Sequence, residues 1–207
     1  MALFVAIMTA IFQQLTGVSA VAYYAPLIFK DAGAGTDSAL IETVLIGLVK
    51  VLFVVVFMFL VDRVGRKKLL IYGAAGMAFC LFVLAYAFAQ NPITKFFDML
   101  IILMVVLHTV SFELSWGGGA WVLISEIFPN RIRGRASSLA SCSLWIATYA
   151  VTQLFPIMLA KLGSIGTYIV FGAFCVIMAL FTHFFLHETA GKSLEQIQED
   201  TANGNKN

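Results

Sequence analysis

The sequence predicts an all-α membrane protein in which six transmembrane helices form one half-bundle. The first observation is composition: of 207 residues, 61% are hydrophobic and only 12% are charged, whereas soluble domains carry about 25% charged residues. The second is length, because about 20 apolar residues cross a bilayer as one helix, which leaves room for roughly six spans. The third is that long apolar runs alternate with short polar breaks along the chain.

Each apolar run is long enough to cross a bilayer as a helix. The runs are residues 3–29, 41–61, 69–90, 99–127, 136–160 and 166–186. With their connections they make residues 1–190 one transmembrane unit. Residues 191–207 are polar and are predicted to form a short C-terminal tail outside the membrane.

Basic residues gather in alternate connections between the runs. Single lysines stand in the first, third and fifth connections, and clusters stand in the second and fourth: Arg63, Arg66, Lys67 and Lys68, then Arg131, Arg133 and Arg135. Cytoplasmic loops of membrane proteins are enriched in Lys and Arg. The pattern therefore places both termini and the tail in the cytoplasm. It predicts a multi-pass protein of the plasma (inner) membrane, with lipid as its surroundings.

Charge, cysteine and histidine content exclude several classes of function. The net charge is only +2, and the basic residues form no single dense run, which argues against nucleic acid as a partner. The cysteines all lie inside apolar runs, and the histidines lie on different segments without metal spacing. We therefore expect a protein that is not an enzyme and holds neither metal nor cofactor.

Polar side chains follow one face of four of the runs. Gln13 and Gln14 lie in the middle of the first, Lys50 in the second, Glu113 in the fourth and Thr148 in the fifth. Helices that face only lipid need no polar side chains, so these four runs are predicted to surround a polar path, with the third and sixth as outer supports. The arrangement repeats every three runs, as in one half of a major facilitator transporter.

Four motifs occur in order along the chain. They are Gln13-Gln14-Leu15-Thr16-Gly17 continuing to Tyr23-Tyr24-Ala25-Pro26, Asp62-Arg63-Val64-Gly65-Arg66-Lys67, Glu126-Ile127-Phe128-Pro129 with Arg131 and Arg133-Gly134-Arg135, and Glu188-Thr189 with Gly191 and Leu194-Glu195. Together they resemble helices seven to twelve of the sugar porter family, which holds hexose facilitators and sugar–proton symporters. The resemblance covers nearly the whole chain but only the C-terminal half of the family's architecture.

The resemblance implies transport of a monosaccharide, a hexose or a pentose, by alternating access, and leaves open whether transport is facilitative or proton-coupled. Amides can donate to one sugar hydroxyl and accept from its neighbour, while aromatic rings cover the apolar face of the sugar. The rival interpretations are interhelical hydrogen bonds for the glutamines and packing for the tryptophans. The predicted substrate-site residues are Gln13, Gln14, Ser19, Tyr23, Lys50, Glu113, Trp121 and Trp145.

Two further sets of residues are predicted to serve conformational change. The resemblance implies that Asp62, Arg66, Glu126 and Arg133 form a cytoplasmic charge cluster that holds the inner side shut; signalling of topology alone is the alternative. The run Gly117, Gly118 and Gly119 predicts a hinge in the fourth span, because each glycine lowers helix propensity by about 1 kcal/mol.

Lys50 is the sharpest departure from the family pattern. Ser19 and Lys50 both stand where the family usually carries asparagine, and Gly118 stands where proline is common. A charge at bilayer depth costs about 2.5–3.5 kcal/mol, and Glu113 is the only acid in the middle of a span. We therefore predict a Lys50–Glu113 ion pair that lines the cavity. A neutral lysine, a lysine that reaches the interface, or a change tolerated in an inactive copy are the alternatives.

Alternating access requires two bundles that move about one site, and the predicted spans supply one. Full function would require an N-terminal six-helix half encoded separately or upstream, or a second copy of the chain. Met1 stands directly before the first span, which favours a split or truncated product. The alternative function is therefore a chain that inserts in the membrane but does not transport alone.

Overall fold

The computed structural model describes residues 2–31, 36–90, 94–129 and 131–186, and these residues are almost entirely helical. The predicted tail at 191–207 and the motif at Glu188-Thr189 lie outside the described residues. The elements are α1 (Ala2–Leu15), α2 (Val18–Asp31), α3 (Thr36–Val64), α4 (Arg66–Phe88), α5 (Lys95–Phe112), the π-helix η1 (Glu113–Gly117), α6 (Gly118–Ile127) and α7 (Arg133–Phe185).

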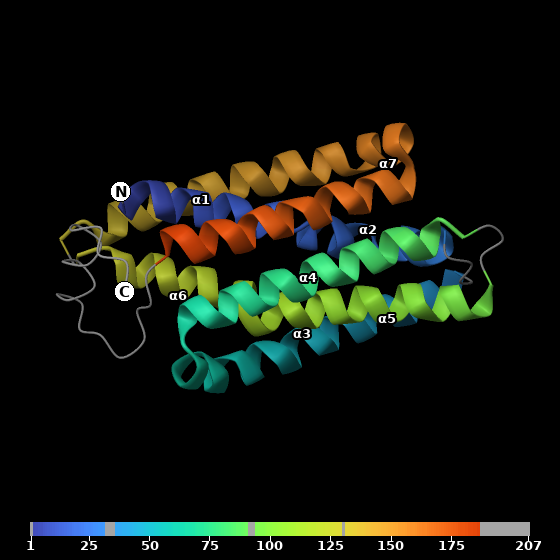
Figure 1. The fold of residues 1–207 in the computed structure, drawn as a ribbon, viewed down its shortest axis with the longest axis horizontal. Helices are drawn as coiled ribbons and strands as arrows, with labels where there is room; N and C mark the ends of the chain where they lie inside the picture. The colour runs from blue at the N-terminus through green and yellow to red at the C-terminus, as the bar shows by residue number, and fades with distance from the viewer. Residues whose placement is uncertain (1, 32–35, 91–93, 130, 187–207) are drawn as a thin grey trace.

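The predicted spans correspond to these elements in order. The first span is α1 with α2, the second α3, the third α4, and the fourth α5, η1 and α6. The fifth and sixth are the two arms of α7, a first arm at 133–162 and a second arm at 164–185. At 53 residues, α7 would be about 80 Å long if straight, more than twice the hydrocarbon core of about 30 Å. Its backbone leaves the helical conformation at Gly163, where φ is 69°, and the arms run back along each other (Figure 1).

The connections that carry the basic clusters share one end of the bundle. The α3–α4 turn and the α6–α7 turn lie at the left of Figure 1, together with the start of α1 and the end of α7. The end of α2, the start of α3, the end of α4, the start of α5 and the bend within α7 lie at the other end. The helix ends that carry the basic clusters and the helix ends that carry single lysines therefore lie at opposite ends of the bundle.

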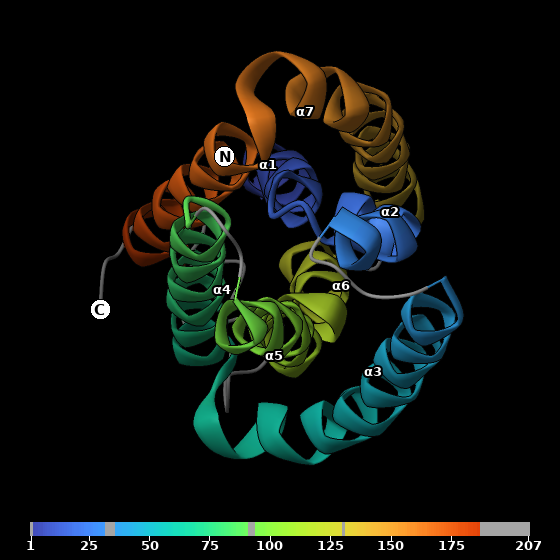
Figure 2. The ribbon, with the colours of Figure 1, turned by 90° about the vertical axis from the view of Figure 1, so that its right-hand side faces the viewer.

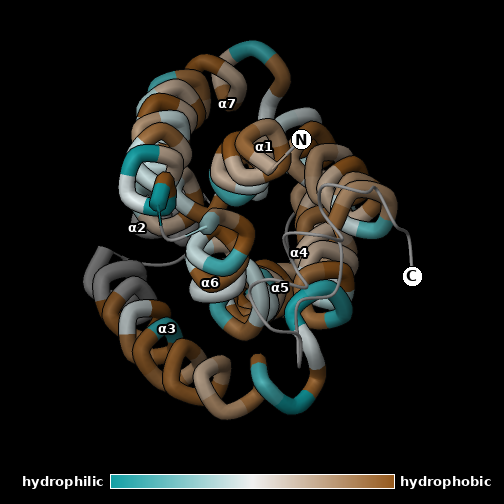
Figure 3. The backbone as a smooth tube through the Cα atoms, turned by 90° about the vertical axis from the view of Figure 1, so that its left-hand side faces the viewer, coloured by the Kyte–Doolittle hydropathy of each residue, from teal (hydrophilic) through white to brown (hydrophobic). Residues whose placement is uncertain are grey.

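Apolar side chains form both the interior and much of the outer surface. Viewed along the helices, α1, α5 and α6 lie in the middle and α3 at the edge (Figure 2). Hydrophobic residues cover most of α3, whereas hydrophilic residues mark the turn that follows it (Figure 3). On α3 the side chains of Leu48, Val51 and Phe59 are exposed, as suits lipid or another bundle. In the described part of the chain, five helices are long and apolar enough to cross a membrane, with α7 counted once. The chain is an integral membrane protein.

The first span is broken between α1 and α2. Gly17 takes a φ of 77° at the break, and a Cβ there would come within 3.0 Å of the ring of Phe171. Glycine is therefore required both by the backbone conformation and by the close packing. Thr16 Oγ1 donates to the Gln13 carbonyl at 2.8 Å, and buried His108 on α5 contacts the Thr16 carbonyl through Nε2 at 3.2 Å. The break thus receives support from its own residues and from the fourth span.

The fourth span is interrupted by η1, and Trp116 anchors this interruption. The Trp116 side chain is fully buried, and its Nε1–H donates to the Leu70 carbonyl on α4 at 2.9 Å. A Cβ at Gly73 of α4 would overlap the side chain of Ser115, so the two backbones approach closely. π-Helical turns are rare and concentrate at functional sites. These two contacts with α4 fix the position of η1.

Replacing Trp116 by Phe should destabilise the fold. Phenylalanine removes the buried hydrogen bond to the Leu70 carbonyl, which is worth about 0.5–1.5 kcal/mol, and it fills less of the packed space around residue 116. Thermal unfolding of the purified protein in detergent should show a lower midpoint for Trp116→Phe. Trp121→Phe is the matched control, because Trp121 is 43% exposed and its indole makes no hydrogen bond among the described residues. Equal midpoints for the two variants would contradict the anchoring role of Trp116.

Candidate functional site

A cavity of about 430 Å³ lies among four of the spans, a volume within the range of about 300–1,000 Å³ for small-molecule sites. Its walls come from α1 and α2, α3, the fourth span and the first arm of α7; α4 and the second arm contribute none of the described lining residues. The division into lining spans and outer supports matches the prediction from the polar faces. The cavity is lined by all eight predicted substrate-site residues: Gln13, Gln14, Ser19, Tyr23, Lys50, Glu113, Trp121 and Trp145.

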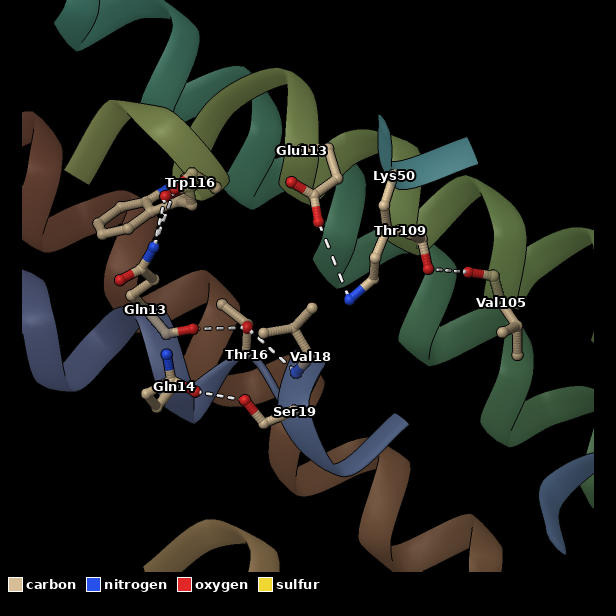
Figure 4. Close-up of polar contacts among 11 residues, drawn as sticks. Gln13, Gln14, Thr16, Val18, Ser19, Lys50, Val105, Thr109, Glu113 and Trp116 are labelled. Carbon is tan, nitrogen blue, oxygen red and sulfur yellow. Dashed lines mark hydrogen bonds and ion pairs between the residues drawn. The ribbon is translucent and has the colours of Figure 1, made fainter. Parts of the chain in front are cut away.

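The two adjacent glutamines are both buried and make different hydrogen bonds (Figure 4). Gln13 Nε2 donates to the Trp116 carbonyl at 2.7 Å and to the Gly117 carbonyl at 3.4 Å. Gln14 Oε1 instead accepts from the Ser19 hydroxyl at 2.6 Å. Gln13 therefore joins α1 to η1, whereas Gln14 is tied to the beginning of α2.

The predicted ion pair between Lys50 and Glu113 is present. Lys50 Nζ lies 3.9 Å from Glu113 Oε1, and the two side chains are 31% and 10% exposed (Figure 4). This distance is too long for a direct hydrogen bond, so the ammonium donors and the carboxylate acceptors face each other across a gap in the cavity wall. Among the described residues, no three His, Cys, Asp or Glu side chains are grouped to hold a metal ion.

Aromatic side chains border the open part of the cavity. Tyr23 and Trp145 are each 65% exposed and Trp121 is 43% exposed. Sequence reasoning did not single out Trp116, and it did not predict the contact of His108 with the broken first span. His108 contacts the Thr16 carbonyl at the break of the first span, whereas Trp116, which lies in η1, donates to the Leu70 carbonyl of α4. The sequence signals that mark them are an indole and an imidazole inside an apolar run, where each needs a partner.

Three of the four predicted gating charges come together at the end of the bundle with the basic connections. The Arg66 guanidinium contacts Asp62 Oδ1 at 2.9 Å and Glu126 Oε1 at 3.2 Å, and so joins the ends of α3 and α6. Arg133 differs from the prediction: within the described residues it forms no ion pair, and its Nε donates to the Phe128 carbonyl at 3.4 Å. The reason is local, because the chain after Phe128 no longer supplies a helical donor to that carbonyl.

The predicted hinge glycines lie where η1 passes into α6. Gly117 is the last residue of η1, and Gly118 and Gly119 begin α6. A Cβ at Gly118 would overlap the ring of Phe57 on α3, whereas a Cβ at Gly119 would come within 3.1 Å of Leu70. The helix is irregular beside the glycines, and Gly118 is also constrained by packing, which the sequence did not reveal.

Comparison with known proteins gives one consistent result. The sugar (and other) transporter family matches residues 1–201. The chain is 40% identical over 201 residues to the D-xylose-proton symporter of Escherichia coli K12, covering 94% of this chain and 40% of that protein. It is 39% identical over 202 residues to the glucose facilitated diffusion protein of Zymomonas mobilis, covering 95% and 42%.

Solved structures agree with the sequence relatives. The proton:xylose symporter XylE with bound 6-bromo-6-deoxy-D-glucose superposes with a TM-score of 0.84 at 39% identity, over 95% of this chain and 42% of that chain. An inward-open structure of XylE from E. coli gives a TM-score of 0.82 at 36% identity, over 96% and 41%. The chain thus spans about two fifths of its relatives, which are transporters and not enzymes. It has the architecture of one six-helix half-bundle, and it belongs to the sugar transporter family of the major facilitator superfamily.

Proposed function

We propose that this chain forms the C-terminal half of a monosaccharide transporter that works by alternating access, and that it supplies half of the substrate site. The observation that carries the proposal is the meeting of Gln14, Lys50 and Glu113 with Trp121 and Trp145 in one membrane-embedded cavity. Donors and acceptors beside aromatic faces suit an uncharged, polyhydroxylated ring. The names of the relatives, a D-xylose-proton symporter and a glucose facilitated diffusion protein, agree with a pentose or a hexose.

The missing wall of the cavity supports a second six-helix unit as partner. Tyr23 and Trp145 line the cavity yet leave 65% of their surface exposed, and an aromatic site for a sugar is expected to enclose most of its ligand. The chain covers only about two fifths of its relatives' length. An N-terminal half-bundle would close the cavity and provide the body against which this one moves.

The charge cluster around Arg66 suits a gate at one end of that cavity. The ion pairs to Asp62 and Glu126 join α3 to α6, and partly exposed pairs of this kind are individually weak enough to break in each cycle. The basic connections at this end favour a cytoplasmic position for it. We therefore place the termini in the cytoplasm and the protein in the plasma (inner) membrane.

Uptake of labelled D-xylose and D-glucose tests the proposal. In a host without its own transporters, we expect saturable uptake when this chain is expressed with the N-terminal six-helix half of a related sugar porter, and none with either half alone. Gln14→Ala should weaken apparent affinity about tenfold, because about 1–2 kcal/mol of hydrogen bonding is lost. Gln90→Ala is the matched control, since the Gln90 side chain, within the described part of the chain, donates only to the Tyr86 carbonyl at the end of α4. Insertion without uptake in any combination would favour the non-transporting alternative.

The Lys50–Glu113 pair should show energetic coupling. Each single variant, Lys50→Gln and Glu113→Gln, leaves one charge without its partner, whereas the double variant removes both. Because Lys50 is about one third exposed, a coupling of about 1 kcal/mol is expected, measured as thermal stability and as sugar affinity in a double-mutant cycle. The pair is functionally irrelevant if Lys50→Gln leaves expression and binding intact while Glu113→Gln alone abolishes them.

Gly118→Ala should slow sugar exchange if the glycine run is a hinge. The new methyl group would also press on Phe57, so the double variant Gly118→Ala/Phe57→Leu separates flexibility from packing. We expect the double variant to regain stability but to keep slow exchange, measured as counterflow of labelled sugar in vesicles. Recovery of wild-type exchange by the double variant would show that Gly118 is needed only for space.

A further inference from the structure

Gln14 and Ser19 form a bond that a continuous helix would not allow. Residues five apart in an α-helix point about 140° away from each other, so their side chains do not meet. The break at Gly17 turns α2 relative to α1 and brings the Ser19 hydroxyl to 2.6 Å from Gln14 Oε1. The short distance between these side chains is therefore a consequence of the broken first span.

This bond occupies the oxygen of the Gln14 amide and leaves its nitrogen for other partners. A primary amide has one acceptor oxygen and two N–H donors, and Ser19 occupies the oxygen. Gln14 Nε2 donates to none of the described residues, and Gln14 lines the cavity. The neighbouring glutamine is arranged in the opposite way: Gln13 Nε2 is bound to the Trp116 carbonyl, and its Oε1 is buried without a partner among the described residues. Of the two amides, Gln14 is the one that keeps free donors.

We propose that Ser19 is a positioning residue that fixes Gln14 as a hydrogen-bond donor toward the substrate, so the sugar oxygen bound there acts as an acceptor. The inference rests on the proposed function and deepens it. The Ser19 hydroxyl donates to no other described residue, so turning the Gln14 amide over would leave that proton without an acceptor among them; without the hydroxyl, the amide is free to present either its oxygen or its nitrogen. Because of Ser19, the site selects a group that accepts a hydrogen bond at one ring position of the sugar. A group that can only donate a hydrogen bond would not satisfy the site there.

Deoxy and fluoro sugars distinguish the two directions. Fluorine in place of a hydroxyl accepts a weak hydrogen bond and cannot donate one, whereas hydrogen does neither. We would measure competition by monodeoxy and monofluoro derivatives of D-glucose and D-xylose against the labelled parent sugar, with this chain expressed together with the N-terminal half of a related sugar porter. At one ring position the fluoro sugar should compete within about 3-fold of the parent, while the deoxy sugar is weaker by about 10-fold, the loss of one good hydrogen bond.

Variants at position 19 then test the role of the serine. Ser19→Ala should reduce the preference for the fluoro sugar over the deoxy sugar to less than about 2-fold at that position. Ser19→Thr keeps a hydroxyl donor and should keep the preference. Gln14→Glu, which offers only acceptors, should bind the fluoro sugar no better than the deoxy sugar. Ser138→Ala is the matched control, because its hydroxyl bonds the Gly134 carbonyl one turn away on α7.

The outcomes separate this inference from the proposed function. An unchanged preference in Ser19→Ala, a Ser19→Thr variant that behaves like Ser19→Ala, or a wild-type protein that favours the fluoro sugar at no position overturns the role of Ser19 while transport stands. Absence of saturable binding of either parent sugar overturns the proposed function, and this inference with it.

Discussion

The site depends on one constraint: inside a bilayer, backbone groups released by a broken helix must be satisfied by the protein. The first and fourth spans are both irregular at the cavity, and each supplies the side chain that supports the other. Gln13 beside the break in the first span donates to the carbonyls of Trp116 and Gly117 in η1. His108 on α5 in turn contacts the Thr16 carbonyl at that break. The two irregular helices are thereby fastened together in the middle of the bundle.

This mutual support determines which groups are left for a substrate. Because Gln13 is bound to η1, its neighbour Gln14 carries the amide donors that no described residue accepts, and the break that needs Gly17 also brings Ser19 to Gln14. The π-helix begins at Glu113, so the same irregularity places the carboxylate that faces Lys50. The paired charges cancel, and the cavity keeps hydrogen-bonding groups without a net charge from these two residues. An uncharged polyol suits such a wall better than an ionic ligand.

The sequence predicted the features that depend on the free energy of transfer into lipid. The lengths of the apolar runs located the spans. The free energy cost of a charge at bilayer depth predicted that Lys50 pairs with Glu113. Helical periodicity predicted that Gln14 and Trp145 face the same cavity, although they lie on distant segments. Trp116 was missed as an anchor, because its partner is a carbonyl of another helix, α4, that comes within reach only through helix packing. The position of Arg133 and the packing of Gly118 on Phe57 depend on how helices are placed beside each other, which periodicity does not encode.

The strength of the contacts differs between the middle of the bundle and its end. In the middle, the bonds from Gln13 to η1 and from Trp116 to α4 are buried, so breaking either one leaves a buried N–H donor without a partner, at a cost of about 1–3 kcal/mol. At the end, Arg66 contacts Asp62, whose side chain is 71% exposed, and an exposed ion pair is worth about 0–1 kcal/mol. A change of shape therefore costs less at the contact between Arg66 and Asp62 than at the buried bonds of Gln13 and Trp116.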